Sequence, residues 1–150
     1  MSNAPPVDLE TAHFIRDHCL CLHAQRAARA LARRFDKALR PLGLTNGQFS
    51  LMTALSRPVP HAMGNLVTLL AMDRTTLTAA LKPLERRGLV EIRTDPDDRR
   101  SRQLMLTPEG RALLAEAVPI WRDTHAEVEA ALGVDPDALR AGLNALNSRD

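Results

Sequence analysis

Three threonines near the start of one predicted helix carry side chains suited to polar recognition. Thr75, Thr76 and Thr78 follow Asp73, a residue type that often caps the first turn of a helix. Their hydroxyls can donate to or accept from the edges of bases, and their methyl groups can touch the methyl group of thymine. Local capping and surface filling are the alternative roles. Arg74, in the same turn, is suited to a phosphate oxygen, although a base contact is also open to it.

Arginines gather at a second place, the turn between two predicted strands. Residues 94–102 are too polar to be buried and are expected to form an exposed hairpin tip. Positive charge concentrated in this way is expected of a protein that binds a polyanion. A solvated run of charge is the alternative interpretation of this segment.

The elements that must position these side chains can be read from periodicity. Leu77, Ala80, Leu81 and Leu84 recur at three- and four-residue spacing, which predicts a helix from about Arg74 with one buried stripe and Gly88 just beyond its end. Residues 89–93 and 103–106 then alternate as two strands that can pair.

The preceding segment predicts the partner of that helix. Thr45 and Gln48 form a capping box ahead of an apolar helix, and a second short apolar helix is expected from about Ala62 to Ala71. Helix, tight turn and helix is the helix-turn-helix order, in which the second helix reads DNA. The helix beginning near Arg74 is therefore the expected reader.

Two stretches together resemble the MarR family of bacterial transcription regulators. They are DRTTLTAALKPLERRGLV, from Asp73, and DPDDRRSRQLMLTPEG, from Asp95. The resemblance implies a mostly α-helical α+β fold, a winged helix-turn-helix with long N- and C-terminal dimerisation helices. It also implies a D-x-R wing tip, in which Arg100 enters the minor groove and Asp98 orients it. The DNA-binding residues expected on this basis are Arg74, Thr75, Thr76, Thr78, Lys82, Asp98, Arg99, Arg100 and Arg102.

The ends of the chain predict a dimer. One helix of about 30 residues is expected from Asp8 to Leu39, and it would be longer than a compact domain of this size is wide. Thr107 and Asp135, each followed by proline, open two further helices, the first of which Pro119 should bend. We expect residues 1–40 and 108–150 to intertwine with a second copy, while residues 41–107 form the DNA-binding lobe.

Composition narrows the class of protein. The chain has 150 residues, 45% of them hydrophobic and 25% charged, which suits one globular domain. Its net charge is only +2, but residues 16–40 carry seven basic and two acidic side chains, as expected of a polyanion binder. Charge that merely solvates the helix faces is the alternative interpretation of that segment. No apolar run is long enough for a membrane span and no signal peptide is visible, so a cytoplasmic location is expected.

Three signals for regulation remain open. Cys19 and Cys21 most simply fill gaps in helix packing, although Cys21 lies in a run similar to the hydroperoxide-sensing branch of the family, whose tyrosines this chain lacks. The same run with His18 and His23 offers too few converging ligands for a zinc site. The family's small aromatic or phenolic effectors suggest a third set of candidates: His23, Arg26, Phe49, Met52 and Trp121.

The sequence gives no sign of catalysis. There is no nucleophile triad, phosphate-binding glycine loop or paired carboxylate motif, so neither an enzyme nor a cofactor is expected. The predicted function is that of a homodimeric DNA-binding regulator, expected to act as a repressor on a palindromic operator. The alternative is a non-catalytic protein-interaction module on the same winged fold.

Overall fold

A computed structural model describes residues 6–147 of the chain, in two compact units. The first unit ends at Arg34 and the second begins at Phe35, so the boundary falls within one helix. The extreme ends of the expected dimerisation segments, residues 1–5 and 148–150, lie outside the described residues. Among the described residues no helix is both long and apolar enough to cross a bilayer.

The first unit corrects the prediction of one unbroken N-terminal helix. Helix α1 (Leu9–His18) and helix α2 (Leu20–Leu39) are separated at Cys19, whose backbone is extended with φ −71° and ψ 107°. The Cys19 sulfur accepts a hydrogen bond from the Leu22 amide at 3.4 Å and so serves the first turn of α2. No residue of α1 is buried, so no tertiary packing opposes this break. Neither proline nor glycine marks the position in the sequence, which explains the error.

The second unit contains the helix-turn-helix. Helix α3 (Asn46–Ala54) follows a short 3₁₀ turn, η1 (Arg40–Leu42), and begins with the expected capping box of Thr45 and Gln48. Helix α4 (Met63–Leu70) leads through Ala71, at φ 50°, into helix α5 (Arg74–Arg86). Asp73 caps α5 and Gly88 lies just beyond its end at φ 70°, both as predicted.

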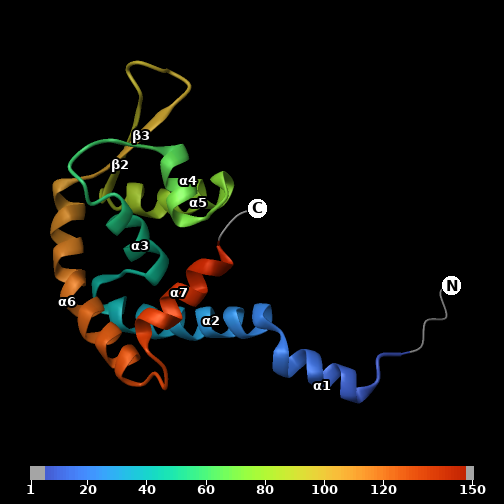
Figure 1. Ribbon diagram of the computed structural model, residues 1–150. Helices are drawn as coiled ribbons and strands as arrows, with labels where there is room; N and C mark the ends of the chain where they lie inside the picture. The colour runs from blue at the N-terminus through green and yellow to red at the C-terminus, as the bar shows by residue number, and fades with distance from the viewer. Residues whose placement is uncertain (1–5, 148–150) are drawn as a thin grey trace. The chain divides into compact units, whose positions relative to one another are not determined.

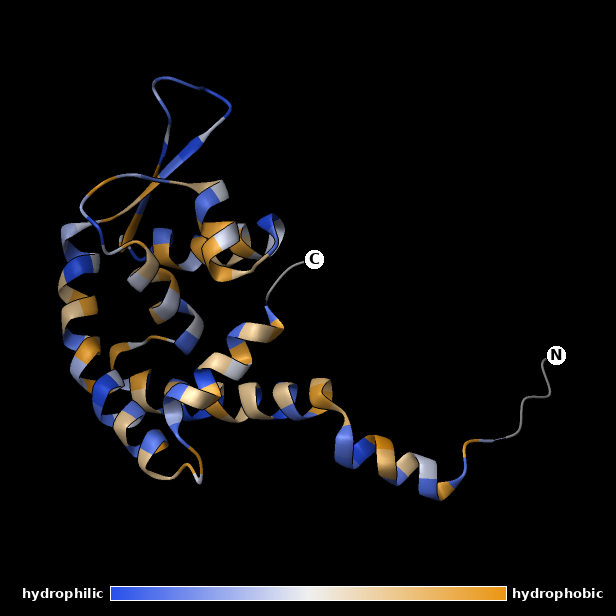
Figure 2. Ribbon diagram, in the orientation of Figure 1, coloured by the Kyte–Doolittle hydropathy of each residue, from blue (hydrophilic) through white to orange (hydrophobic). Residues whose placement is uncertain are grey.

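A small antiparallel sheet completes this lobe (Figure 1). Strand β2 (Val90–Thr94) and strand β3 (Arg102–Leu106) pair as a hairpin, here called the wing, with Val90 opposite Leu106 and Thr94 opposite Arg102. Strand β1 (His61–Ala62) was not predicted. It pairs with the other edge of β3, His61 opposite Leu104. Figure 2 shows apolar residues at the root of the wing and hydrophilic residues toward its tip.

The core lies between the helices and the root of the sheet. The three leucines of the predicted α5 stripe, Leu77, Leu81 and Leu84, have no exposed surface, and Ala80 is partly buried beside them. The core also includes Leu39, Leu51, Met52, Leu55, Leu66, Leu104 and Leu106. Burial of each large apolar side chain contributes on the order of 1.5–3 kcal/mol relative to exposure. This packing fixes the buried face of α5, and therefore the face that it leaves to solvent.

Two side chains, Arg87 and Asp36, bond to backbone groups near the start of α3. The Arg87 guanidinium donates to the carbonyls of Gly43, at 2.7 Å, and Leu42, at 3.2 Å. The Asp36 carboxylate accepts from the Asn46 amide at 2.6 Å and so supports the start of α3. The Arg87 bonds join residues 44 and 45 positions apart in sequence, and such long-range contacts are not revealed by periodicity.

Helix α6 (Pro108–Ala130) begins against the end of α5. The Thr107 hydroxyl donates to the Gly88 carbonyl at 2.6 Å and accepts from the Gly110 amide at 3.0 Å. The helix continues through Pro119, and Figure 1 shows it curving, in keeping with the expected bend. Helix α7 (Pro136–Leu146) starts at the predicted Asp135 cap.

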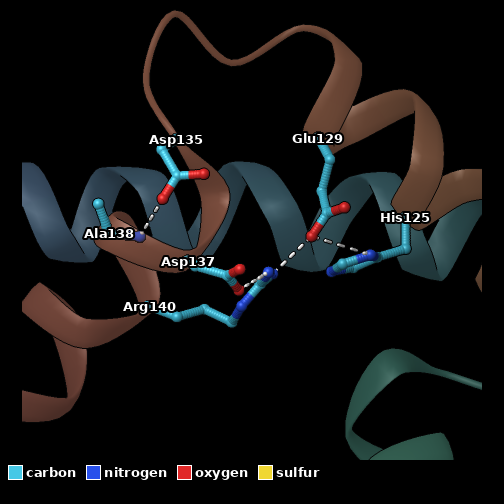
Figure 3. A network of polar contacts seen from close by, with 6 residues as sticks. All are labelled: His125, Glu129, Asp135, Asp137, Ala138 and Arg140. Carbon is cyan, nitrogen blue, oxygen red and sulfur yellow. Dashed lines mark hydrogen bonds and ion pairs between the residues drawn. The ribbon is translucent and has the colours of Figure 1, made fainter.

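A polar network joins α6 to α7 (Figure 3). The Arg140 guanidinium bonds to Glu129 on α6 and to Asp137 in the first turn of α7. These two carboxylates raise the pKa of Arg140, because both favour its charged form. His125 lies 3.7 Å from the same Glu129 carboxylate. The apolar residues Leu139, Leu143 and Leu146 of α7 remain exposed.

Candidate nucleic-acid interface

The first turn of α5 uses one of the predicted threonines for capping. The Asp73 carboxylate accepts from the Thr76 hydroxyl at 2.6 Å and from the Thr76 amide at 2.8 Å. These two bonds lower the pKa of Asp73, because they stabilise its ionised form. Thr76 is exposed, but its hydroxyl proton serves this cap. The structure therefore gives Thr76 the capping role that was the alternative to base contact.

The next turns of α5 bring four of the predicted residues together. Arg74, Thr75, Thr78 and Lys82 line an open hollow of about 410 Å³ with Ala79, and all five residues are exposed. We call this the α5 hollow. Thr76 is not among its lining residues. Sequence reasoning missed Ala79, although it follows Thr75 by four residues and so shares its helix face.

The tip of the wing is shaped by two aspartates. The Asp98 carboxylate accepts from the Arg100 backbone amide at 3.0 Å, and the Asp98 carbonyl accepts from the Ser101 amide at 2.9 Å. Asp95 closes the other side of the turn by accepting from the Asp97 amide at 2.9 Å. Asp98 thus holds the backbone of Arg100, while the Arg100 side chain is exposed.

The remaining wing cations divide into two kinds. Arg102 lies with its guanidinium 3.4 Å from both the Thr94 hydroxyl and the Arg99 carbonyl, so it braces the hairpin from within. Arg99 is exposed at the tip beside Arg100. Arg93, which was not predicted as a site residue, pairs with Glu91 on β2, and this pairing raises the pKa of Arg93.

A helix N-terminus lies beside the hollow's cations. The first turn of α5 carries the positive end of the helix dipole, and Arg74 stands in that turn. Partial charge from backbone amides and full charge from Arg74 and Lys82 both favour phosphate oxygens. Hydroxyl and methyl groups then lie between these cations. The cations at the rim of the α5 hollow can bind the phosphates of a polyanion. The hydroxyl and methyl groups at its centre can contact the groups that lie between those phosphates.

The residues considered for regulation are divided between the two units. In the first unit Cys19 and Cys21 are both free thiols, and Cys21 accepts from the Gln25 amide nitrogen at 3.2 Å. His23 and Arg26 line a hollow of about 470 Å³ along α2, together with Arg29 and Arg33.

In the second unit the three apolar candidates belong to the core or its edge. Met52 has no exposed surface and Phe49 only 7%. Trp121 is half-buried and stacks on Phe49, with ring centroids 6.1 Å apart, and on His125 at 4.6 Å. Aromatic packing accounts for their positions.

Metal binding finds no support in the geometry of the described residues. Nowhere in residues 6–147 do three or more histidine, cysteine, aspartate or glutamate side chains gather closely enough to hold an ion. His18 instead stacks on Phe14 and has Nδ1 at 2.8 Å from the Phe14 carbonyl. His23 has Nδ1 at the same distance from the Cys19 carbonyl.

The MarR family model matches residues 44–101, which contain α5 and most of the wing. The solved structure of the transcriptional regulator MosR of M. tuberculosis in complex with DNA is 41% identical, with a TM-score of 0.80, and the match covers 86% of this chain and 93% of that one.

Two further relatives are also proteins that regulate transcription. The transcriptional regulator HosA of Escherichia coli O157:H7 is 31% identical over 96 residues, which are 64% of this chain and 71% of HosA. The transcriptional activatory protein BadR of Rhodopseudomonas palustris is 37% identical over 89 residues, 57% of this chain. The chain matches about half of BadR's length, 51%.

The fold, the family model and the relatives all indicate the same class of protein. The mostly helical α+β architecture with a three-stranded sheet is that of the winged helix-turn-helix in the DNA-bound MosR structure, as predicted. BadR is named as a transcriptional activatory protein, and HosA and MosR are named as transcriptional regulators. None of the three is named as an enzyme. The chain therefore belongs to the MarR family of transcriptional regulators and is not an enzyme.

Proposed function

We propose that this protein is a sequence-specific DNA-binding regulator that reads an operator with α5 and the wing. The observation that carries the proposal is the α5 hollow, an exposed face with cations at its rim and small side chains at its centre. The arginine-tipped wing belongs to the same unit and is exposed. The DNA-bound structure of MosR, at 41% identity, supports DNA as the partner.

In the proposed complex each part has a separate task. Arg74 and Lys82 contact phosphates on either side of the major groove, while Thr75, Thr78 and Ala79 face the base edges. Arg100 enters the adjacent minor groove, where Asp98 fixes its backbone and Arg99 contacts phosphate. Arg102 contributes by bracing the hairpin, and it reaches phosphate only by leaving Thr94.

We propose that two copies act together, through residues 1–40 and 108–150, with residues 41–107 as the reading lobe. The exposed leucines of α7 and the exposed Leu9, Phe14, Ile15 and Leu20 of the first unit support this dimer. Apolar surface of this extent is costly in water and is typical of an interface. A twofold dimer requires a near-palindromic operator with half-sites about one helical turn apart.

We propose that the protein represses transcription while it is bound to DNA, and that one of two triggers releases it. A small aromatic or phenolic effector is one, and oxidation of the thiols at the α1–α2 junction is the other. The position of Cys19 between two helices supports the second, because a change at its sulfur removes the hydrogen bond from Leu22. Peroxide should release DNA from the wild type but not from Cys19→Ser and Cys21→Ser variants. Equal release from all three proteins would leave the effector as the trigger.

Selection of bound duplexes from a random pool tests DNA reading itself. The protein should enrich a near-palindrome, and its affinity should fall steeply between low and moderate salt as counterions are released from phosphates. The proposed setting is the cytoplasm, where such a duplex is accessible. The alternative, a protein-interaction module, predicts that no sequence is enriched and that salt has little effect.

A further inference from the structure

The hydroxyl protons of two α5 threonines are already committed within the helix. Thr76 donates to Asp73, as described, and Thr78 donates to the Arg74 carbonyl at 2.8 Å. Each hydroxyl has a single proton, so neither residue retains a donor for a base. Thr75 alone among the three has no hydrogen bond from its hydroxyl within the described chain, so it is the free hydroxyl of the α5 hollow.

With the Thr78 hydroxyl turned back toward the preceding turn, its methyl group is what remains to face outward. Ala79 lies beside it in the α5 hollow and adds a second methyl group. Arg74, Thr78 and Lys82 follow one another at four-residue spacing, with the two methyl groups between the two cations. Eight residues of helix span about 12 Å, which is roughly the rise of three to four base pairs.

The major-groove code identifies the base that such a surface suits. Guanine presents two acceptors there, N7 and O6, which require donors, whereas thymine presents a 5-methyl group that requires apolar contact. Thr78 and Ala79 have no proton to offer and two methyl groups to present. An acidic side chain, which would suit the amino group of cytosine, is not among the residues lining the α5 hollow.

We propose that Thr78 and Ala79 read the 5-methyl group of a thymine in each half-site of the operator. Thr75 supplies the directional hydrogen bond to a neighbouring base, and Thr76 takes part only by capping the helix. This inference rests on the proposed function and specifies the base class that it recognises.

Deoxyuridine is the probe that isolates this contact. It differs from thymidine only by the missing 5-methyl group, which lies in the major groove, so contacts of the wing in the minor groove are unaffected. In the full-length protein bound to its selected duplex, each thymine of a half-site is replaced by uracil in turn. One or two positions should weaken binding about fourfold each, the effect of roughly one buried methyl group, and other positions should not.

A pair of substitutions separates the methyl group of Thr78 from its hydroxyl. Thr78→Ser keeps the hydroxyl and loses the methyl group, so the ratio of thymine to uracil affinity at the sensitive position should fall toward one. Thr78→Val keeps a methyl group and loses the hydroxyl, so it should retain that discrimination. The readout is the ratio of the two affinities, which a general loss of binding does not change.

Thr53 provides the matched control. Its hydroxyl donates to the Phe49 carbonyl at 2.8 Å, the same bond that Thr78 makes, but on α3. Thr53→Ser should leave the ratio of thymine to uracil affinity unchanged, and circular dichroism of each variant checks that the helices are intact.

The outcomes distinguish this inference from the proposed function. A selected duplex that is insensitive to uracil at every thymine, or discrimination lost in Thr78→Val and kept in Thr78→Ser, would overturn the methyl contact while DNA reading stands. Failure to select any duplex would instead overturn DNA reading. The methyl contact is established if uracil weakens binding at one or two positions, and if this effect is kept in Thr78→Val and reduced in Thr78→Ser.

Discussion

Arg100 stands at the exposed tip of the wing, with its backbone held by Asp98. An arginine placed in a narrow minor groove is attracted by the concentrated phosphate potential there. Arg100→Ala should therefore weaken operator binding by about 1–3 kcal/mol. Fluorescence anisotropy with the selected duplex measures the loss.

The matched control removes the same charge elsewhere. Arg122 is exposed on α6 and is not among the residues proposed to contact DNA, so Arg122→Ala should have little effect on affinity. Equal affinities of Arg100→Ala and the wild type would exclude the minor-groove contact. Equal losses of affinity in both variants would show that Arg100 contributes only through its overall positive charge.

The burial of His61 predicts that the stability of the fold depends on pH. The His61 side chain is 6% exposed, its Nε2 atom has no hydrogen-bond partner in the described chain, and burial together with the charge of Arg57 lowers its pKa. The unfolded chain therefore binds a proton more readily than the folded chain. Stability should be complete above the ordinary histidine pKa of 6.5 and should fall as the pH drops below it.

Urea unfolding at several pH values checks this expectation. The free energy of unfolding should fall with acidification more steeply in the wild type than in His61→Asn, by no more than about 1.4 kcal/mol per pH unit for one proton. The comparison concerns slopes, so a uniform loss of stability in the variant does not affect it. Parallel slopes would show that His61 is protonated equally in both states.

The first turn of α6 passes very close to Leu89, the residue before β2. A Cβ atom on Gly110 would lie 2.1 Å from the Leu89 carbonyl oxygen, which belongs to backbone and has little freedom to shift. Gly110→Ala should destabilise the fold by about 3 kcal/mol through overpacking. Thermal and urea unfolding measure the change.

Gly142 is the control within another helix. Nothing lies within 4 Å of a Cβ built there, so Gly142→Ala should stabilise the protein by about 0.5–1 kcal/mol through helix propensity. If Gly110→Ala were as stable as Gly142→Ala, the close approach of α6 to Leu89 would be incorrect.

Sequence patterns predicted the elements best where local chemistry determines them. The caps at Thr45, Asp73, Thr107 and Asp135 were confirmed because each depends on a side chain and an amide three residues later. The break at Cys19 and strand β1 were missed. The first depends on a weak sulfur cap in an unburied helix, and the second on pairing with a strand more than 40 residues away.

For the candidate site, the sequence predicted which face of α5 is exposed but not the hydrogen bond that each side chain makes. The period of the buried leucines already points Thr75, Thr78 and Lys82 toward solvent. Which hydroxyl stays free depends on rotamers, because Thr76 and Thr78 each have a backbone or carboxylate acceptor within reach. The roles assigned to these residues in DNA reading remain predictions.

At the scale of the whole molecule, the exposed apolar surface of α7 supports the proposed second copy. Leu143 is 46% exposed on α7. Polar contacts are formed elsewhere on this helix, since Asp135 caps its start and Arg140 bonds to Glu129. Leu143→Glu should raise the dimer dissociation constant at least about tenfold, since it places a charge in an apolar interface. Sedimentation velocity over a range of concentrations measures this shift.

Asn144→Glu adds the same charge one position further along α7, at a residue that is polar already. It should leave the dimer intact. A wild type that remains monomeric at all concentrations, or equal behaviour of both variants, would exclude α7 from the interface.

The mass of the complex with a selected near-palindromic duplex, measured by native mass spectrometry, tests most directly whether two copies present matched α5 helices and wings to one DNA. We predict two chains per duplex, with neither half-site alone binding as tightly as the pair. One chain per duplex at saturation, with equal affinity for a single half-site, would contradict the proposed symmetric reading of the operator.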